Sequence, residues 1–427
     1  MTHRRRRLAA KTRTLCTILT TTGVLAGAAL TGAAPAGAAS GAGRITSGAG
    51  RIASGAGRIA SGVTYRQFDV PTARGTAHAH LLTVDLTDPH VHVDLLSPGA
   101  VAARSPVSAM ADAAGAVAGV NGDFFNITEA QHPGVEATGA SVGPAIAHGG
   151  VLKSAVPTAQ RFGPSLPPGT DTTDVFGVGM DRRARLDRLT LAGTVRTRDA
   201  TLTLRGLNQY ALAEGSVGAY TAAWGPASRK RATCGSDTNR AAGCSTDTYE
   251  VRIRRGRVVA TSGTPGSGAI TAGTTVLLGR EAGADRLRAL TRGERVAVRE
   301  FLVASASGIP YRFAVGGYPV LRGGEPLAGL NATTAAVRTA VGYASGGRRL
   351  LLLALDGAVA YRSGLTIAEV ADEMRKLGAV DAFSLDGGGS TTMVARTAGA
   401  KTVSVLNHPT ESPERAVANG IGVFWKP

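Results

Sequence analysis

The sequence predicts an α+β fold with mixed sheets, formed as a single globular catalytic domain. Two observations predict it: a strand–helix–strand pattern over residues 350–385, and a similar helix–strand pattern over residues 105–120. Each pattern ends in a glycine turn that carries an aspartate. With 427 residues and 43% hydrophobic content, the chain is long enough to bury a large core. Its 58 glycines indicate many turns.

The amino-terminal residues predict export. Basic residues precede a mostly apolar stretch over 15–30, and small residues follow at 36–38, which is typical of a signal peptide over residues 1–38. Residues 39–62 then repeat Ser-Gly-Ala-Gly-Arg-Ile, and two glycines in every seven residues predict a flexible linker rather than a helix. We therefore expect a secreted, extracellular protein whose catalytic domain covers residues 63–427.

Composition argues against a nucleic-acid-binding protein and against a membrane-spanning protein. The net charge is +17, but part of this excess lies in the predicted signal, and aromatic residues make up only 4% of the chain. A nucleic-acid surface with stacking aromatics is therefore not expected, and the basic surface is assigned to an anionic cell wall or substrate. No apolar run reaches the roughly 18 residues of a membrane span, so no membrane-spanning segment is expected.

Two cysteines remain after the predicted signal is removed. Cys234 and Cys244 lie ten positions apart in a polar, glycine-containing segment. In an exported chain this spacing predicts one disulfide. A metal or catalytic thiol pair is the less favoured alternative, because no histidine lies nearby.

The elements follow in order along the domain. Residues 79–86 and 91–96 alternate in hydropathy and predict a hairpin across Thr87-Asp88-Pro89. A second series of apolar or alternating runs predicts further strands at 201–205, 249–254, 257–261, 295–303 and 312–315.

Two similar units contain the acidic turns. In the first, a helix begins at Ser105-Pro106 and ends at Gly115, and a strand over 116–120 leads into Asn121-Gly122-Asp123. In the second, the apolar strand 350–355 stops at Asp356, a helix begins at Thr366 with Glu369 completing a capping box, and the strand 379–385 leads into Asp386. A right-handed crossover places Asp356 and Asp386 on one rim of the sheet. The repetition predicts that Asn121 and Asp123 approach Asp386.

The residues around Asp386 suggest an anion site. Gly387, Gly388 and Gly389 could present backbone N–H groups to a phosphate, and the hydroxyls of Ser390 and Thr391 could add donors. A simple turn is the alternative. Arg338 has the planar fork that suits a phosphate.

Carboxylates beside a phosphate need an explanation. Either a divalent cation bridges them, with Asp123, Asp356 and Asp386 as its candidate ligands, or one carboxylate is protonated and acts as a general acid. Paired carboxylates are also what glycoside cleavage requires. The pairs His78/His80 and His90/His92 have zinc-ligand spacing on strands, but no third ligand follows, so surface positions are favoured.

Several motifs occur in a familiar order. They are Asn121 to Phe125, Gly316 to Leu321, Arg338 to Gly342, Ser384 to Met393, Asn407-His408-Pro409, and Arg415 to Asn419. Over residues 81–424 the chain resembles the phosphodiester glycosidase family. The resemblance implies hydrolysis of the bond between a sugar anomeric carbon and a phosphodiester oxygen. It also implies an active site with Asp386, Gly388, Gly389, Ser390, Asn121, Asp123 and Arg338, and substrate contacts from Arg415 and Asn419.

The chain departs from the family pattern at two places. Ala358 stands where an arginine is expected after Asp356-Gly357, and Ser384 replaces an asparagine. We expect a secreted hydrolase that cleaves a sugar-1-phosphodiester, or a related glycosidic bond, in a cell-envelope or extracellular glycan such as a teichoic acid. Asp386 is expected to be the main catalytic carboxylate, with Asp123 or Asp356 as its acid–base partner. The alternatives are a glycosidase acting on a polysaccharide without phosphate, and a carbohydrate-binding wall protein without activity.

Overall fold

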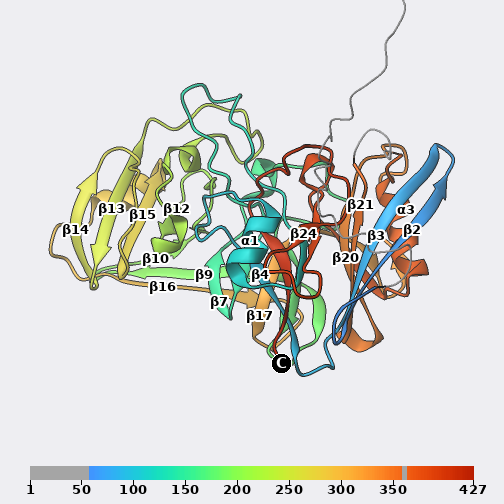
Figure 1. Ribbon diagram of the computed structural model, residues 1–427. Helices are drawn as coiled ribbons and strands as arrows, with labels where there is room; N and C mark the ends of the chain where they lie inside the picture. Colours follow the sequence, from blue (N-terminus) through green and yellow to red (C-terminus); the bar gives the residue numbers. More distant parts are fainter. Residues whose placement is uncertain (1–56, 358–362) are drawn as a thin grey trace, which may run out of the picture. The chain divides into compact units, whose positions relative to one another are not determined.

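Antiparallel β-strands are the predominant secondary structure of the folded chain (Figure 1). The computed structural model describes residues 57–357 and 363–427, so the predicted signal peptide, most of the predicted linker and Ala358 lie outside the described residues. Strands account for 41% of the residues and helices for 11%. The predicted α+β class with mixed sheets is therefore wrong. The predicted helices over 107–114 and 367–376 do form, but the strands around them pair with antiparallel neighbours.

The largest sheet is central to the site. Its eight strands, in spatial order, are β1 (Gly57–Ala60), β2 (Val63–Thr72), β3 (Gly75–Asp85), β21 (Arg349–Leu355), β20 (Thr339–Ala344), β22 (Asp381–Ser384), β18 (Tyr318–Arg322) and β19 (Glu325–Pro326). Because β20 pairs antiparallel with both β21 and β22, those two strands run in the same direction with β20 between them. Asp356 and Asp386, which follow them, therefore lie at the same edge of the sheet. Strand β1 is formed from the end of the predicted linker.

Both faces of this sheet are buried, which explains the continuous apolar run in β21. Leu351, Leu353 and Leu355 belong to one core cluster, which also contains residues of helix α3 (Ile367–Lys376). Leu350 and Leu352 belong to a second cluster, shared with strands of two other sheets. Since neighbouring side chains of a strand point to opposite faces, a strand covered on both sides needs apolar residues at every position.

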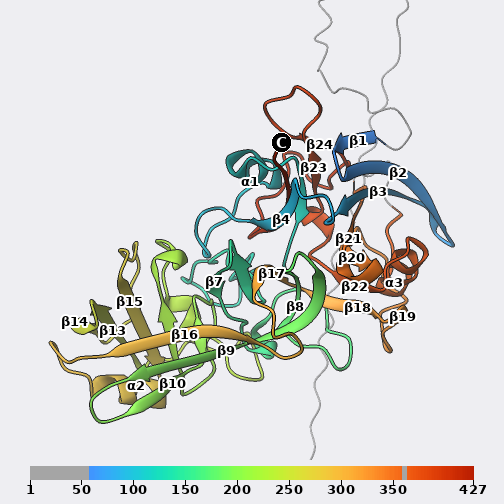
Figure 2. The ribbon, with the colours of Figure 1, turned by 90° about the horizontal axis from the view of Figure 1, so that it is seen from below.

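Helix α3 forms as predicted. The Thr366 side chain accepts a hydrogen bond from the Glu369 N–H, and the Glu369 side chain accepts one from the Thr366 N–H, which completes the capping box. Gly378 follows the helix with a φ of +92°, a conformation that favours glycine. The helix packs against β18 and β22 (Figure 2).

A five-stranded sheet carries the first acidic turn. Its strands, in order, are β24 (Ser404–Val405), β23 (Met393–Ala395), β5 (Ala118–Asn121), β25 (Gly420–Trp425) and β4 (Val91–Leu96). Helix α1 (Val107–Ala114) precedes β5 and ends at Gly115.

The predicted hairpin between residues 79–86 and 91–96 is wrong. Strand β3 pairs with β2 and β21, whereas β4 pairs with β25 of the other sheet. Each segment has the alternation of a strand, but alternation does not identify the partner. The segment before β3 supplies a ten-residue antiparallel partner that the sequence analysis did not include.

Two further sheets cover residues 145–316. A seven-stranded sheet contains β10 (Thr201–Leu204), β9 (Ala184–Arg196), β8 (Asp174–Gly179), β17 (Tyr311–Gly316), β6 (Ala145–Ala147) and β7 (Gly150–Lys153) in order, with β16 (Ala297–Ala304) paired to β9 (Figure 2). A five-stranded sheet contains β11 (Gly206–Leu207), β12 (Val217–Tyr220), β15 (Thr274–Arg280), β13 (Thr248–Arg254) and β14 (Arg257–Ser262), beside helix α2 (Ala282–Arg288). The second series of predicted strands is confirmed within one or two residues at each end. No helix of the described residues is long and apolar enough to cross a bilayer.

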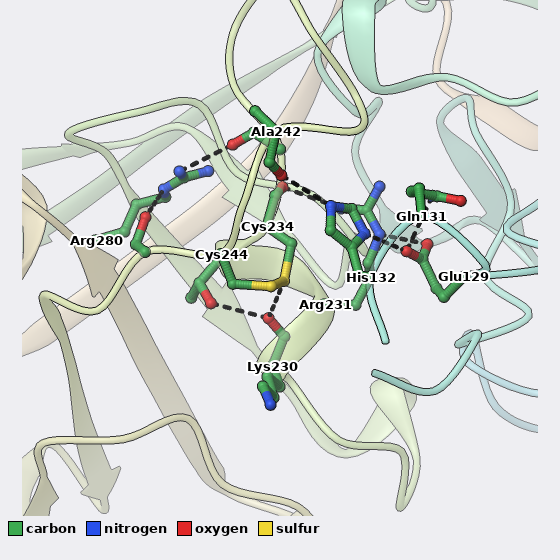
Figure 3. Close-up of a disulfide and its surroundings, with 12 residues drawn as sticks. Glu129, Gln131, His132, Lys230, Arg231, Cys234, Ala242, Cys244 and Arg280 are labelled. Atoms are coloured by element: carbon green, nitrogen blue, oxygen red, sulfur yellow. Dashed lines mark hydrogen bonds and ion pairs between the residues drawn. A yellow bond between two sulfur atoms is a disulfide. The ribbon is translucent and has the colours of Figure 1, made fainter. Parts of the chain in front are cut away.

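The predicted disulfide is confirmed, and a buried polar cluster lies beside it (Figure 3). Cys234 and Cys244 are joined. The buried Glu129 carboxylate accepts hydrogen bonds from Arg231 and from Asn126, and it lies 2.6 Å from His132 Nδ1. Because Arg231 also donates to the Cys234 carbonyl at 3.1 Å, this cluster fixes the disulfide loop against residues 126–132.

We expect Glu129→Ala to lower the free energy of unfolding by about 3–5 kcal/mol, because it leaves the buried Arg231 guanidinium without its carboxylate. Chemical denaturation of the oxidised protein measures this change. Asp247→Ala is the matched control, since it breaks an exposed pair with Arg288 and should cost about 1 kcal/mol or less. Equal effects of the two variants would contradict the assignment.

Candidate functional site

The two acidic turns contact each other directly. The Asn121 side-chain amide donates to the Asp386 carbonyl at 2.7 Å, and the Asp386 N–H donates to the Gly122 carbonyl at 2.9 Å. The Asn121 Oδ1 atom accepts from the Thr339 hydroxyl at 2.7 Å and from the Thr392 N–H at 3.2 Å. Asn121 is fully buried, and these hydrogen bonds make it a positioning residue for the two turns.

Asp123 is held in the interior beside this contact. Its N–H donates to the Asn419 Oδ1 atom at 2.9 Å, and its Oδ2 atom accepts from the Gly143 N–H at 2.6 Å. Its Oδ1 atom is buried with no hydrogen-bond partner among the described residues. Burial raises the pKa of Asp123, although the charges of Lys153 and Arg161 oppose this. A carboxyl group with a raised pKa and an unpaired oxygen is suited to carry a proton.

Asp386 is less enclosed. Its Oδ1 atom accepts from the Gly387 N–H at 2.9 Å, and its carboxylate interacts with Ser390. The pKa of Asp386 is raised to about 6, mainly by burial and to a smaller extent by the charge of Asp123, whereas Ser390, Gly387 and Arg415 oppose the change. The two carboxyl groups therefore lie within each other's electrostatic field, as the repeated pattern predicts.

Residues 387–391, called the glycine loop below, use most of their N–H groups in hydrogen bonds within the protein. Besides the Gly387 bond to the carboxylate, the Gly388 N–H donates to the Val337 carbonyl at 2.8 Å. The Ser390 and Thr391 N–H groups donate to the carbonyls of Gly387 and Gly388, each at 3.2 Å. These four groups are not available to a phosphate in this conformation. The glycines are required for shape instead, since Gly388 has a φ of +59° and a Cβ at Gly389 would collide with the Arg415 guanidinium.

Two of the predicted binding residues are buried. The Thr391 hydroxyl lies 3.2 Å from the Thr339 hydroxyl, beneath the loop, and Thr391 itself has no exposed surface. Asn419 is buried and bonded to the Asp123 backbone. Asn419 therefore acts on Asp123 through the main chain, and both predicted binding residues support the interior of the site in this conformation.

The predicted arginines lie at the edge of the site. Arg338 is half-buried, and its guanidinium donates to the carbonyls of Leu365 at 3.0 Å and Thr334 at 2.9 Å. Arg415 forms an ion pair with Glu411, and its Nη1 atom lies 3.5 Å from the Ser390 hydroxyl. Arg415 is therefore the predicted cation that contacts the glycine loop.

Asp356 has different surroundings from the other two acids. Its Oδ1 atom lies 2.8 Å from His80 Nε2 and accepts from the His408 N–H at 2.7 Å, and its Oδ2 atom lies 3.1 Å from His408 Nδ1. Burial alone would raise the pKa of Asp356, but the hydrogen bonds from the two histidines outweigh it and lower the pKa. This carboxylate is held ionised and is unsuited to act as a general acid.

The structure adds residues that the sequence analysis did not single out. Arg161 lies over the Phe124 ring, 5.4 Å from its centre, and Phe124 stacks on Tyr318 at 5.8 Å. The Arg161 Nη2 atom is buried with no partner among the described residues. Lys153 is buried and donates to the Ser154 carbonyl at 2.7 Å. Tyr318 lies in a quoted motif, but nothing in the local sequence around Arg161 or Lys153 distinguishes them from other basic residues.

The three aspartates do not form a metal cluster. Within the described residues, the group with metal-ligand spacing is His80, Asp356 and His408. The prediction that His80 is a surface residue is wrong, since it is only 2% exposed. The pair Asp123 and Asp386 fits acid–base chemistry without a bridging cation, because burial raises the pKa of both carboxyl groups and favours their protonated forms.

Comparison with known proteins agrees with this geometry. Residues 247–424 match the phosphodiester glycosidase family. The resemblance found in the sequence is thereby confirmed for this part of the chain, which holds Arg338, Asp356, the glycine loop and Arg415. Asn121 and Asp123 precede the matched segment and reach it through the contact with Asp386. No curated protein sequence matches the chain.

Solved structures share the fold. A hypothetical protein from Synechocystis matches with a TM-score of 0.65 and 20% identity over 86% of this chain, which spans 62% of that protein. A protein from Burkholderia pseudomallei matches with a TM-score of 0.62 and 24% identity over 82% of this chain and 74% of its own. The catalytic domain of zebrafish N-acetylglucosamine-1-phosphodiester alpha-N-acetylglucosaminidase gives a TM-score of 0.43 and 15% identity over 87% of each chain, too low to support an argument.

We expect Asp386→Asn to be stabilised relative to the wild type as the pH rises from about 4 to about 7. The folded-state pKa of about 6 exceeds the ordinary value of 3.8, so the wild type loses stability as Asp386 ionises, and the amide does not ionise. Free energies of unfolding measured across this range, with the exposed Asp372→Asn as a control, test the prediction. A difference between Asp386→Asn and wild type that stays constant with pH would contradict it.

Proposed function

We propose that this protein is a hydrolase that cleaves the bond between a sugar anomeric carbon and a phosphodiester oxygen. The observation that carries the proposal is the pairing of Asp123 and Asp386, two carboxyl groups with raised pKa values, beside a glycine loop that contacts Arg415. Two acids held at different depths can serve as proton donor and as ionised carboxylate in one reaction. The family match over residues 247–424 supports the same reaction class.

The surroundings of the two acids suggest their roles. Asp123 is buried with one unpaired oxygen, so we assign it the proton that goes to the departing oxygen. Asp386 is partly exposed and its charge is supported by Gly387 and Ser390, so we assign it the ionised state, in which it attacks the anomeric carbon or activates water. Asp356 supports the neighbouring segment instead, because both of its oxygens are bonded to histidines.

A phosphate leaving group places particular demands on the site. A phosphate departs as a stable anion, so it needs cations more than it needs a proton. Arg415 at the glycine loop, Arg338 at the end of β20 and the unpaired Nη2 atom of Arg161 are the charges that could supply this.

We propose that the substrate is an extracellular or cell-envelope glycan. The predicted signal peptide and the disulfide Cys234–Cys244 support a secreted protein, since disulfides persist in oxidising compartments. A chain rich in basic residues would also be attracted to anionic wall polymers.

One observation favours a second candidate, a glycosidase acting on glycans without phosphate. Arg415 is already paired with Glu411, and Arg338 already donates to two backbone carbonyls. An arginine with these partners must give some of them up to bind a phosphate. The two candidates differ in whether phosphate in the substrate increases the rate.

We expect Asp386→Asn to lower kcat for a sugar-1-phosphodiester by about 10³-fold, the range expected on loss of a residue that acts directly in general acid–base chemistry. Release of free sugar from defined sugar-1-phosphodiesters measures the rate. Asp372→Asn, on the exposed side of α3, should behave as wild type. Full activity of folded Asp386→Asn would remove this residue from the mechanism.

We expect Arg415→Ala to raise KM for a phosphodiester substrate by about 10–100-fold, because a charge-assisted contact contributes roughly 1.5–3 kcal/mol. The same variant should change KM little for a matched glycoside without phosphate. Arg375→Ala is the control, since Arg375 is likewise paired with an acid, Asp372, but lies on α3 away from the loop. Equal losses on both substrates would favour the glycosidase without phosphate specificity.

A further inference from the structure

Three side chains from separate parts of the chain converge beside the glycine loop. His80 lies on β3, Asp356 follows β21, and His408 lies in the segment between β24 and β25. Their ligand atoms lie within 4.8 Å of one another. The sequence analysis noted the zinc-ligand spacing of His78 and His80 and found no third ligand, because the other two donors are more than 270 positions away along the chain.

We propose that His80, Asp356 and His408 form a binding site for a divalent transition-metal ion of the zinc class. Two imidazoles and one carboxylate are a donor set that zinc and its neighbours prefer, whereas calcium and magnesium prefer oxygen donors alone. Three protein ligands leave a fourth position for water, as in zinc sites that stay open.

The distances fit this assignment. His80 Nε2 lies 2.8 Å from Asp356 Oδ1, and His408 Nδ1 lies 3.1 Å from Asp356 Oδ2. Ligand atoms about 2.0–2.2 Å from a tetrahedral zinc are separated by roughly 3.3–3.5 Å. Each of these two histidine–carboxylate contacts therefore needs to lengthen by only a few tenths of an ångström to accept the ion, and all three ligand atoms already lie within 4.8 Å of one another.

Neighbouring groups hold the proposed ligands His80 and Asp356 in place by hydrogen bonds. The Tyr65 hydroxyl lies 2.7 Å from His80 Nδ1, on the side of the ring away from Asp356. When Nε2 binds the ion, the ring proton resides on Nδ1 and is donated to the Tyr65 oxygen, which fixes the ring as outer partners do in known sites. Asp356 is 4% exposed and is held by the His408 N–H at 2.7 Å.

An ion can reach this site from one side. His80 and Asp356 are buried, whereas the His408 side chain is 51% exposed. The His408 carbonyl accepts from the Gly357 N–H at 2.6 Å, and the Thr410 hydroxyl lies 3.5 Å from the Gly388 carbonyl. A bound ion would therefore fix residues 408–410 against the strand end and beside the glycine loop.

Metal titration tests the proposal without any substrate. The full chain, purified without a polyhistidine tag and stripped with a chelator, is titrated with Zn²⁺ by calorimetry and with Co²⁺ by visible absorption. We expect one equivalent of each ion to bind, with the intense absorption of a tetrahedral cobalt site, and Zn²⁺ to raise the melting temperature. Because no turnover is measured, failure of this test is distinct from failure of the proposed function.

Variants identify the ligands. His408→Ala should weaken Zn²⁺ binding by more than about 100-fold and abolish the rise in melting temperature, and Tyr65→Phe should weaken binding by about 10-fold, as expected for an outer partner. His78→Ala is the matched control, since His78 lies two residues from His80 and its partly exposed side chain pairs with Asp69, and it should bind as wild type. His408→Ala alters an exposed side chain, so a folded variant is expected.

Two results would overturn the proposal. Absence of stoichiometric binding to the wild type would show that these residues form a hydrogen-bonded network only. Binding to His408→Ala with the wild-type affinity would place the ion elsewhere in the chain.

Discussion

The site depends on the contact between the Asn121-Gly122 turn and the backbone of Asp386. Two hydrogen bonds join the end of β5 in one sheet to the end of β22 in another. Both use main-chain atoms of the acidic turns, so the relative position of the two carboxylates is set by backbone geometry. Residues that belong to neither turn, such as Asn419, reinforce the same arrangement.

This arrangement keeps two acids in a region where their charges are disfavoured. Burial raises the pKa values of Asp123 and Asp386, the charge of Asp123 adds to the increase at Asp386, and Lys153, Arg161 and Arg415 limit it. The cost of burying Lys153 is reduced because its ammonium group donates to backbone carbonyls, including that of Ser154. The polar groups around the acids thus stabilise buried ionisable side chains that apolar surroundings alone would strongly destabilise.

Local sequence predicted the elements better than their pairing. The capping box of α3, the glycine that ends α1 and the apolar run of β21 each follow from residues close together in sequence, and each is present in the structure. The wrong hairpin and the wrong fold class have a common cause. Strand alternation identifies a face but not a partner, so the crossing of the chain from β3 to β4 into a second sheet was not predictable.

The candidate site was also predictable only in part, because local sequence patterns do not show how distant segments pack together. The repeated pattern predicted that Asn121 and Asp123 approach Asp386, which the structure confirms. It did not predict that the loop N–H groups bond within the protein, because that depends on how the loop turns back on itself and packs on Val337. Arg161 and Lys153 carry no local signal, since their importance comes only from burial near Asp123.

The difference in exposure between the two parts of the site has a consequence for how the protein could diversify. The residues that fix the carboxylates, such as Asn121 and Asn419, are buried, whereas Glu411 and His408 at the edge are exposed. Under the proposed function, substitutions at the edge would alter which substrate is accepted while the interior geometry stays unchanged. Homologues with the same acidic pair and different edge residues would then share the proposed reaction and differ in the molecules on which they act.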